Sequence, residues 1–188
     1  MKKLLLISGD LATGKSRFAG ILSQRYGITV MYKDKIKEIL GDTVGFKDRE
    51  ENLKLSYATM ELMTYGFSEL AMLGGDLILE ANFKGYELSK LHEIAKNAGY
   101  RVLTLVLRAD MEIIYQRFVN RIEKEGRHPV HISGFDGYDS FKSYVEKSRK
   151  ENILGASIII DADDFSYQTD EGLLSEIDEF MGESHENH

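Results

Sequence analysis

Two glycines, a lysine and a serine near the start of the chain have the types and spacing that suit phosphate chemistry. The segment Gly9–Ser16 reads GDLATGKS, which gives the pattern Gly-x-x-x-x-Gly-Lys-Ser. Glycines in such a loop let backbone N–H groups curl round a phosphate, and a helix that starts there adds the positive end of its dipole. The apolar run Leu4–Ile7 precedes the loop and the amphipathic stretch Arg17–Tyr26 follows it. This order of strand, loop and helix predicts a nucleoside triphosphate site.

The loop residues have distinct expected roles in this site. The Lys15 ammonium can reach the β- and γ-phosphates, and the Ser16 hydroxyl can bind Mg²⁺. We therefore expect a nucleoside triphosphate and Mg²⁺ here, with Lys15 as a catalytic residue and Ser16 as the metal ligand. The residues of this segment expected to contact the nucleotide are Gly9, Asp10, Leu11, Ala12, Thr13, Gly14, Lys15, Ser16 and Arg17.

The composition is that of an ordinary globular domain. The chain has 188 residues, of which 43% are hydrophobic and 29% are charged. This length suits one domain with its own core, so we expect a single domain over residues 1–188. No apolar run approaches the ~20 residues that span a membrane. The absence of cysteine excludes a disulfide framework, and together these features favour a cytoplasmic protein without a membrane partner.

Acidic residues are concentrated at the C-terminal end. Residues 161–188 contain ten Asp and Glu and no Lys or Arg, whereas the first 160 residues carry 21 acids and 24 bases. The net charge of −7 therefore comes from the last segment, which we interpret as a solvated face. This distribution argues against nucleic acid as the main partner.

Short apolar runs alternate with amphipathic stretches along the whole chain. This alternation predicts an α/β domain of three layers with a parallel sheet, and such sheets bind ligands at the carboxyl ends of their strands. The expected strands cover 3–8, 28–32, 77–81, 101–107 and 157–160. The expected helices cover 15–26, 34–40, about 50–73, 87–98, 110–125, 139–152 and about 170–181.

Two helices carry further local signals. Asp110 precedes an apolar-periodic stretch and is expected to be an N-cap. The long helix has large apolar residues spaced by three and four, which we interpret as a core stripe rather than a cofactor site. These residues are Leu53, Tyr57, Met60, Met63, Phe67 and Leu70.

Carboxylates follow the second and third strands. Asp34 comes just after the second strand, where it can accept the proton of an acceptor hydroxyl, cap the next helix, or do both. Glu80 and Asn82 end the third strand and project to the same face. Glu80 can support Mg²⁺ through water or orient substrate, and Asn82 can hydrogen-bond substrate. The alternative for Glu80 is a buried structural carboxylate paired with Lys or Arg.

An arginine-rich segment follows the fourth strand. Arg117 and Arg121 lie four residues apart on one helix face, and Arg127 follows in a stretch punctuated by Gly126, Gly134 and Gly137. This pattern predicts a lid over about 117–138 that closes on the triphosphate. In the alternative, Arg117 and Arg121 pair with glutamates on a solvated face. His128 and His131 are expected to be hydrogen-bonding residues of the lid, with a metal site as the alternative.

Taken together, these residues resemble the P-loop small-molecule kinases. The similar group includes chloramphenicol phosphotransferase, gluconate and shikimate kinases, the kinase half of polynucleotide kinase, and zeta-type toxins. The resemblance covers nearly the whole chain. It rests on Gly9–Ser16, Tyr32–Asp34, Leu79–Phe83, the pair Arg117-x-x-x-Arg121, and Arg127-His128.

The resemblance implies a fold and a set of roles. It implies the three-layer P-loop NTPase fold with a five-stranded parallel sheet in the order 2-3-1-4-5 and a helical lid. Asp34 would be the catalytic base, Arg117 would lie against the adenine, and Arg121 and Arg127 would act on phosphates as catalytic residues. The segment Asp161–Phe165 would border the adenine pocket.

The expected acceptor site is less well defined by the resemblance. It would lie over an insert at about 34–75, with Arg49 as a further substrate residue beside Asp34, Glu80 and Asn82. The third strand ends in Glu rather than the common Asp, and the stretch Gly41–Glu51 matches no single member.

Three functions remain open from the sequence. The leading one is transfer of the γ-phosphoryl group of Mg-ATP to a hydroxyl of a small molecule. The second is a kinase whose acceptor belongs to a macromolecular pathway, either a nucleotide-sugar precursor or a polynucleotide 5′-hydroxyl. The third is a nucleotide-dependent switch or a plain ATPase. The presence of both Asp34 and the lid arginines favours transfer over binding alone.

Overall fold

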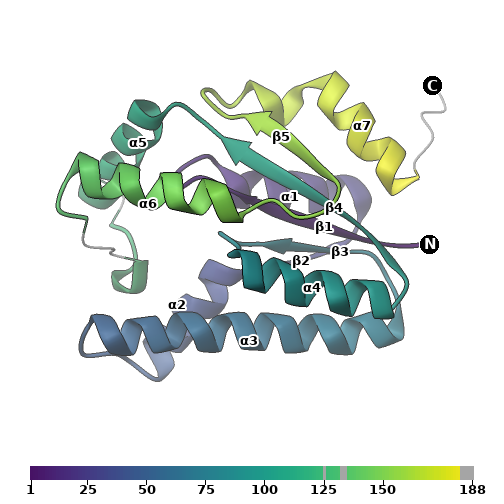
Figure 1. Ribbon diagram of the computed structural model, residues 1–188, viewed down its shortest axis with the longest axis horizontal. Helices are drawn as coiled ribbons and strands as arrows, with labels where there is room; N and C mark the ends of the chain where they lie inside the picture. Colours follow the sequence, from purple (N-terminus) through teal and green to yellow (C-terminus); the bar gives the residue numbers. More distant parts are fainter. Residues whose placement is uncertain (125, 132–134, 183–188) are drawn as a thin grey trace.

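The chain folds around a five-stranded parallel sheet. The computed structural model describes residues 1–124, 126–131 and 135–182, and within them the strand order is β2-β3-β1-β4-β5 (Figure 1). The sheet order and the P-loop NTPase fold class are therefore as predicted. The strands are β1 Lys2–Gly9, β2 Thr29–Tyr32, β3 Leu77–Glu80, β4 Tyr100–Arg108 and β5 Ser157–Asp161.

The helices also follow the sequence periodicity to within about two residues, apart from α2, which extends three residues beyond its expected end. Asp110 Oδ1 accepts hydrogen bonds from the backbone N–H groups of Glu112 and Ile113, so this residue caps α5 as predicted. The helices are α1 Lys15–Tyr26, α2 Lys33–Thr43, α3 Arg49–Leu73, α4 Gly85–Asn97, α5 Met111–Lys124, α6 Tyr138–Glu151 and α7 Glu171–Met181, with 3₁₀ turns η1 Pro129–His131 and η2 Ser166–Thr169.

The sheet separates two apolar cores because successive side chains of a strand point to opposite faces. Leu4 and Leu6 of β1 pack with Phe67 of α3 and with apolar residues of α4. Leu5 and Ile7 pack on the other face, with apolar residues of α1, α5, α6 and α7. Figure 1 shows α3 and α4 side by side below the sheet, and the C-terminal α7 on the opposite side. The molecule is therefore a three-layer sandwich.

The core stripe predicted along α3 is only half correct. Met60, Met63 and Phe67 are buried, but Leu53 and Tyr57 are 47% and 48% exposed. Leu70 is also exposed, and the inward face continues instead through Ala71. The N-terminal end of α3 extends beyond the strands (Figure 1), so Leu53 and Tyr57 do not pack on the sheet. Leu53 and Tyr57 line the cleft described below.

The parallel register brings the expected site residues to one edge of the sheet. Glu80 at the end of β3 pairs with Ile7 of β1 on one side and with Tyr32 of β2 on the other. The loop after β1 and the start of α2 therefore flank Glu80. In the part of the chain that the structure describes, no helix is long and apolar enough to cross a membrane.

Gly9 ends β1 in a conformation that only glycine adopts readily. Its φ is +122°, and a Cβ built on it would lie 2.0 Å from the backbone oxygen of Leu107. We expect Gly9→Ala to lower the free energy of unfolding by at least about 3 kcal/mol. The backbones of β1 and β4 could move apart to make room for the Cβ only by breaking hydrogen bonds of the sheet. Urea unfolding monitored by circular dichroism measures this change.

Gly27 provides the matched control for this substitution. It also has a positive φ, +63°, but a Cβ there would meet no atom within 4 Å. Gly27→Ala should therefore cost only about 1 kcal/mol, the cost of a left-handed residue without a clash. Equal losses for the two variants would contradict the steric explanation.

Candidate active site

A large cleft lies at the carboxyl edge of the sheet. Its volume is about 1470 Å³, whereas a pocket for one drug-sized ligand usually has roughly 300–1,000 Å³. The phosphate-binding loop forms one wall, α2 and α3 form another, and α5 with η1 closes the side. The volume is sufficient for two substrates to lie end to end.

The loop presents the open N-terminus of α1 to this cleft. Gly14 is the N-cap residue with φ +85°, and no side chain caps the helix. A Cβ at Gly14 would lie 2.8 Å from the Tyr167 hydroxyl, so the position needs glycine for space as well as for conformation. The first N–H groups of a helix have no partner within the helix. Here they are available to an anion, such as a phosphate, in the cleft.

Lys15 is folded over the loop that it follows. Its Nζ donates to the backbone oxygen of Asp10 at 2.5 Å and lies 3.4 Å from that of Gly9. Burial lowers the pKa of Lys15, and Glu80 and Asp34 act in the opposite direction. The ammonium is thus held in the cleft by neutral carbonyl groups, which a phosphate can outcompete.

Ser16 and Glu80 form the pair expected beside a nucleotide-bound cation. The Ser16 hydroxyl donates to Glu80 Oε2 at 3.0 Å, and Glu80 is 5% exposed. Burial raises the pKa of Glu80, while Lys15 opposes this shift. A hydroxyl and a carboxylate are the hard oxygen donors that Mg²⁺ prefers, usually together with phosphate oxygens. These residues fit Mg²⁺ held mainly by the nucleotide.

Asp34 lies in the cleft but does not cap a helix. Tyr32 occupies the N-cap position of α2, and Asp34 is the second residue of the helix. The capping alternative is therefore wrong for this residue. The side chain is 59% exposed, and its Oδ1 lies 3.9 Å from His131 Nδ1. It lines the cleft together with Lys15 and contributes to the electrostatic field on that ammonium.

Arg117 lies against the segment that the resemblance placed at the base of the nucleotide. Its guanidinium donates to the backbone oxygens of Ala162 at 2.8 Å and Asp163 at 2.5 Å. It also stacks over the Phe165 ring, 4.4 Å from the ring centre. The arginine and this aromatic residue both line the cleft beside the loop. Pairing of Arg117 with a glutamate on a solvated face is thus not its arrangement.

Arg121 and Arg127 line the cleft between the loop and α2. Burial lowers the pKa of Arg127, and Asp34 opposes this shift. Arg121 contributes to the field on Lys15 and on Glu80. The expected lid, residues 117–138, thus has its first part in α5, and its residues 125 and 132–134 lie outside the described residues.

The part of the expected lid around η1 is hydrogen-bonded to α2 and α3. The backbone oxygen of Val130 accepts from Lys37 Nζ at 3.0 Å and from Asn52 Nδ2 at 3.1 Å. His128 contacts Asp42, and His131 contacts Glu38. Both histidines are hydrogen-bonding residues. Within the described residues, no group of three or more His, Asp or Glu side chains could hold a metal ion.

The remaining expected substrate residues all reach the cleft. Arg49 opens α3, and Asn82 follows β3. The sequence reasoning missed several cleft residues, because single positively charged or aromatic residues on helices or at their starts carry no motif. These residues are Lys33, Lys37, Lys84 and Tyr144.

Two of the loop residues expected to contact the nucleotide form contacts within the protein. Gly9 and Asp10 are not among the described residues that line the cleft. The Asp10 backbone N–H donates to the Leu107 oxygen at 2.8 Å, and its carboxylate is bound by Arg149 of α6. Arg149 lies 139 residues away, and the sequence analysis did not identify it.

Comparison with known proteins agrees with this geometry. The solved structures that the fold resembles include P-loop kinases. A protein of Chloroflexus aurantiacus J-10-fl described as a candidate kinase has a TM-score of 0.82, is 19% identical, and is matched over 98% of this chain and 99% of that chain. Shikimate kinase from Bacteroides thetaiotaomicron has a TM-score of 0.58 and 15% identity over 96% and 98% of the two chains.

The chain belongs to the zeta toxin family. The model of that family matches residues 1–164. A structure from the PezAT chromosomal toxin–antitoxin system of Streptococcus pneumoniae has a TM-score of 0.58 and 18% identity, over 87% of this chain and 70% of that chain. At these identities the structural likeness concerns the fold. Among curated proteins, no sequence matches the chain.

The buried His131 should make the stability of the protein depend on pH. Burial lowers the pKa of His131 from its ordinary value of 6.5, with Arg127 acting in the same direction and Asp34 and Glu38 against it. As the pH falls below 6.5, the unfolded chain takes up the proton first. The free energy of unfolding should therefore fall on acidification through this range, by up to about 1.4 kcal/mol per pH unit.

The contribution of His131 is isolated by comparing the wild type with His131→Gln. Urea unfolding is measured at pH values from about 7.5 to about 5, a range that brackets the ordinary histidine pKa. The free energy of unfolding should fall less on acidification in the variant than in the wild type. His92, whose pKa burial also lowers, is present in both proteins, so its effect cancels. Parallel pH curves would show that His131 does not titrate differently in the folded state.

Proposed function

We propose that this protein is a phosphotransferase that moves the γ-phosphoryl group of Mg-ATP to a hydroxyl of a small molecule. The observation that carries the proposal is the meeting of three features in one cleft. These are an uncapped helix N-terminus with Lys15, the hydrogen-bonded pair of Ser16 and Glu80, and the carboxylate of Asp34. A site that only bound nucleotide would have no need of the third feature.

The nucleotide would lie with its phosphates on the loop and its base between α5 and the segment after β5. The first N–H groups of α1 and the Lys15 ammonium would bind the phosphates. The flat guanidinium of Arg117 is fixed by two backbone oxygens and by Phe165, so one face can stack on a base. When bound, Mg²⁺ would neutralise charge on the phosphate oxygens, with Ser16 as its protein ligand and Glu80 behind it.

Asp34 would act as the general base. The acceptor hydroxyl gives its proton to Asp34, its oxygen forms a bond to the γ-phosphorus, and the bond to the β-phosphate oxygen breaks to release ADP. Asp34 is exposed to the cleft, and so it can receive an acceptor directly. Arg121 and Arg127 line the cleft nearby and would stabilise the charge on the transferring group.

The acceptor would bind between the insert at about 34–75, which contains α2 and α3, and the neighbouring α6. This end of the cleft is lined by Lys37, Arg49, Asn82 and Tyr144. Burial raises the pKa of Tyr144, and Asn82 opposes this shift. We propose Arg49 and Asn82 as acceptor-binding residues, and residues 117–138 as the lid over both substrates.

A second candidate is the same transfer with a nucleotide-sugar precursor as the acceptor. Membership of the zeta toxin family favours it. The cleft also has several cations at its acceptor end, which suit an acceptor that carries phosphate. These cations are Lys33, Lys37, Arg49 and Lys84.

Replacing Asp34 tests the proposed function directly. Asp34→Asn keeps the size of the side chain but cannot accept a proton, so acceptor-dependent ADP release should fall by about 10²–10⁴-fold. ATP binding should persist, because the lost charge repels phosphate. The measurements are ATP calorimetry and a coupled ADP assay with Mg-ATP and a panel of hydroxyl compounds, including sugars, nucleosides and nucleotide sugars.

Two further variants complete this test. Asp139 is an exposed acid in the first turn of α6, away from the cleft, so Asp139→Asn should leave turnover unchanged. Lys15→Ala should remove transfer while leaving the fold intact. Full activity in Asp34→Asn would refute the role of the base, and ADP release that no acceptor stimulates would favour a plain ATPase.

The three lid arginines should separate into two kinetic classes. Arg121→Ala and Arg127→Ala should each lower kcat by about 10²-fold or more, the scale of losing one preorganised charge donor. Arg117→Ala should mainly raise the KM for ATP, because base stacking is similar in the ground and transition states. Steady-state kinetics with varied ATP measures both parameters.

Arg101 gives the control for general effects of removing an arginine. It lies in β4 outside the cleft, with its guanidinium 5.2 Å from the centre of the Phe180 ring. Arg101→Ala should leave kcat and KM unchanged. The same kinetic change at Arg117, Arg121 and Arg127 would contradict the proposed division of roles.

A further inference from the structure

Asp10 is the most heavily hydrogen-bonded residue of the phosphate-binding loop, and every polar group it has is engaged by protein. Its N–H donates to the Leu107 oxygen at 2.8 Å. Its carbonyl oxygen accepts from Lys15 Nζ at 2.5 Å and from Thr13 Oγ1 at 2.9 Å. Its carboxylate accepts from the Ala109 N–H at 3.2 Å. The orientation of this one residue therefore sets the positions of the lysine and the loop.

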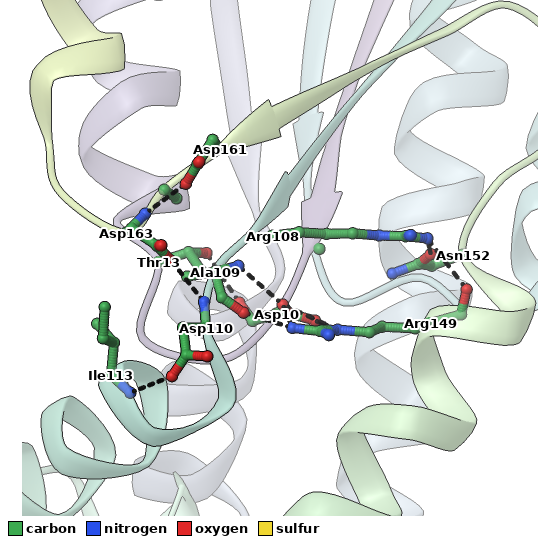
Figure 2. A network of polar contacts seen from close by, with 12 residues as sticks. Asp10, Thr13, Arg108, Ala109, Asp110, Ile113, Arg149, Asn152, Asp161 and Asp163 are labelled. Atoms are coloured by element: carbon green, nitrogen blue, oxygen red, sulfur yellow. Dashed lines mark hydrogen bonds and ion pairs between the residues drawn. The ribbon is translucent and has the colours of Figure 1, made fainter.

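Arg149 holds the Asp10 carboxylate from the other side. Its Nε lies 3.1 Å and 3.2 Å from the two carboxylate oxygens, and its Nη2 lies 2.6 Å from Oδ2. The same Nη2 donates to the Ala109 oxygen at 2.5 Å. Figure 2 shows Arg149 reaching from α6 to Asp10 beneath the end of β4. Such fork-shaped pairing fixes direction as well as distance.

The helix that supplies Arg149 is itself tied to the sheet. Arg108 at the end of β4 donates to the backbone oxygen of Arg149 at 3.2 Å and lies 3.4 Å from Asn152 Oδ1 (Figure 2). Tyr144, five residues before Arg149 in α6, lines the cleft at the proposed acceptor end. The support of the phosphate-binding loop thus comes from a helix that also borders the acceptor.

The negative charge of Asp10 must be neutralised by Arg149 if the loop is to bind an anionic ligand. A carboxylate in a loop that receives phosphates would repel them unless a cation neutralises it. The Asp10 side chain is 1% exposed and that of Arg149 is 28% exposed, so water cannot fully replace the partner of the carboxylate. An unpaired Asp10 would turn toward solvent and take its carbonyl oxygen, and with it Lys15, out of place.

We propose that Arg149 is a positioning residue for the nucleotide, which acts through Asp10 to hold Lys15 and the phosphate-binding loop in their binding geometry. The proposal rests on the proposed function, since it needs the loop to bind a triphosphate. It assigns to α6 a part in nucleotide binding although Arg149 itself does not line the cleft among the described residues.

The chain offers a closely matched control pair. Arg25 at the end of α1 binds the buried Asp178 of α7 by the same fork, with Nε at 2.8 Å from Oδ1 and Nη2 at 2.5 Å from Oδ2. Neither of these two residues lines the cleft. Arg25→Gln therefore imposes a similar structural loss, a buried carboxylate without its arginine, at a distance from the loop.

The experiment compares ATP binding by calorimetry in the wild type, Arg149→Gln and Arg25→Gln, below the unfolding transition of each protein. We expect Arg149→Gln to weaken ATP binding by about 10- to 100-fold, the scale of a small misplacement of binding groups. Arg25→Gln should keep the wild-type affinity although its thermal midpoint falls by a similar amount. The double variant Asp10→Asn with Arg149→Gln should regain part of the affinity, because it removes the unpaired charge.

Arg149→Lys provides a second measurement if Arg149→Gln does not fold. Lysine keeps the charge without the fork, so its ATP affinity should fall several-fold. Wild-type affinity in whichever of these variants folds would overturn the proposal, as would equal weakening in Arg25→Gln. A wild-type protein that binds no ATP would overturn the proposed function and this inference together, whereas intact wild-type binding with unaffected variants would overturn only the inference.

Discussion

The close approach of β1 to β4 at their carboxyl ends is the constraint on which the site depends. The Asp10 N–H donates to the Leu107 oxygen at 2.8 Å, and no side chain fits on Gly9 beside that oxygen. The chain therefore leaves the central strand with a positive φ and turns directly into α1. This path aims the open end of α1 at the sheet edge, where the register of β3 against β1 also places Glu80.

The cleft also contains charged side chains that are largely buried. Burial shifts the pKa of Lys15 and of Arg127 downward and that of Glu80 upward, so each group is less stable in its charged form than it would be in water. Their mutual attraction offsets part of this cost. A triphosphate with a divalent cation would supply the missing partners for the cations. The buried charges of such a site lower the free energy of unfolding but favour ligand binding, a common feature of functional sites.

Much of the fold and of the loop could be predicted because the signals are local. The glycine-lysine-serine spacing, the strand and helix periods, and the cap at Asp110 each depend on residues a few positions apart. The stripe on α3 shows where this reasoning fails. Leu53 and Met60 follow the same spacing, but only Met60 has the sheet beneath it, while Leu53 lies in the cleft. Periodicity reports which residues share a face, and not what covers that face.

The sequence by itself determined the order of the elements, the parallel sheet and a phosphate-binding loop with Lys15 and Ser16 at its end. Only the tertiary structure decided the partners of that loop. The sequence predicts Asp10 as a nucleotide contact, but it does not indicate that the Asp10 carboxylate binds Arg149, 139 residues further along the chain. His131 likewise meets Asp34 and Glu38 of α2 only because η1 packs on that helix. Contacts between such distant residues leave no local pattern, since chain packing rather than neighbouring residues brings them together.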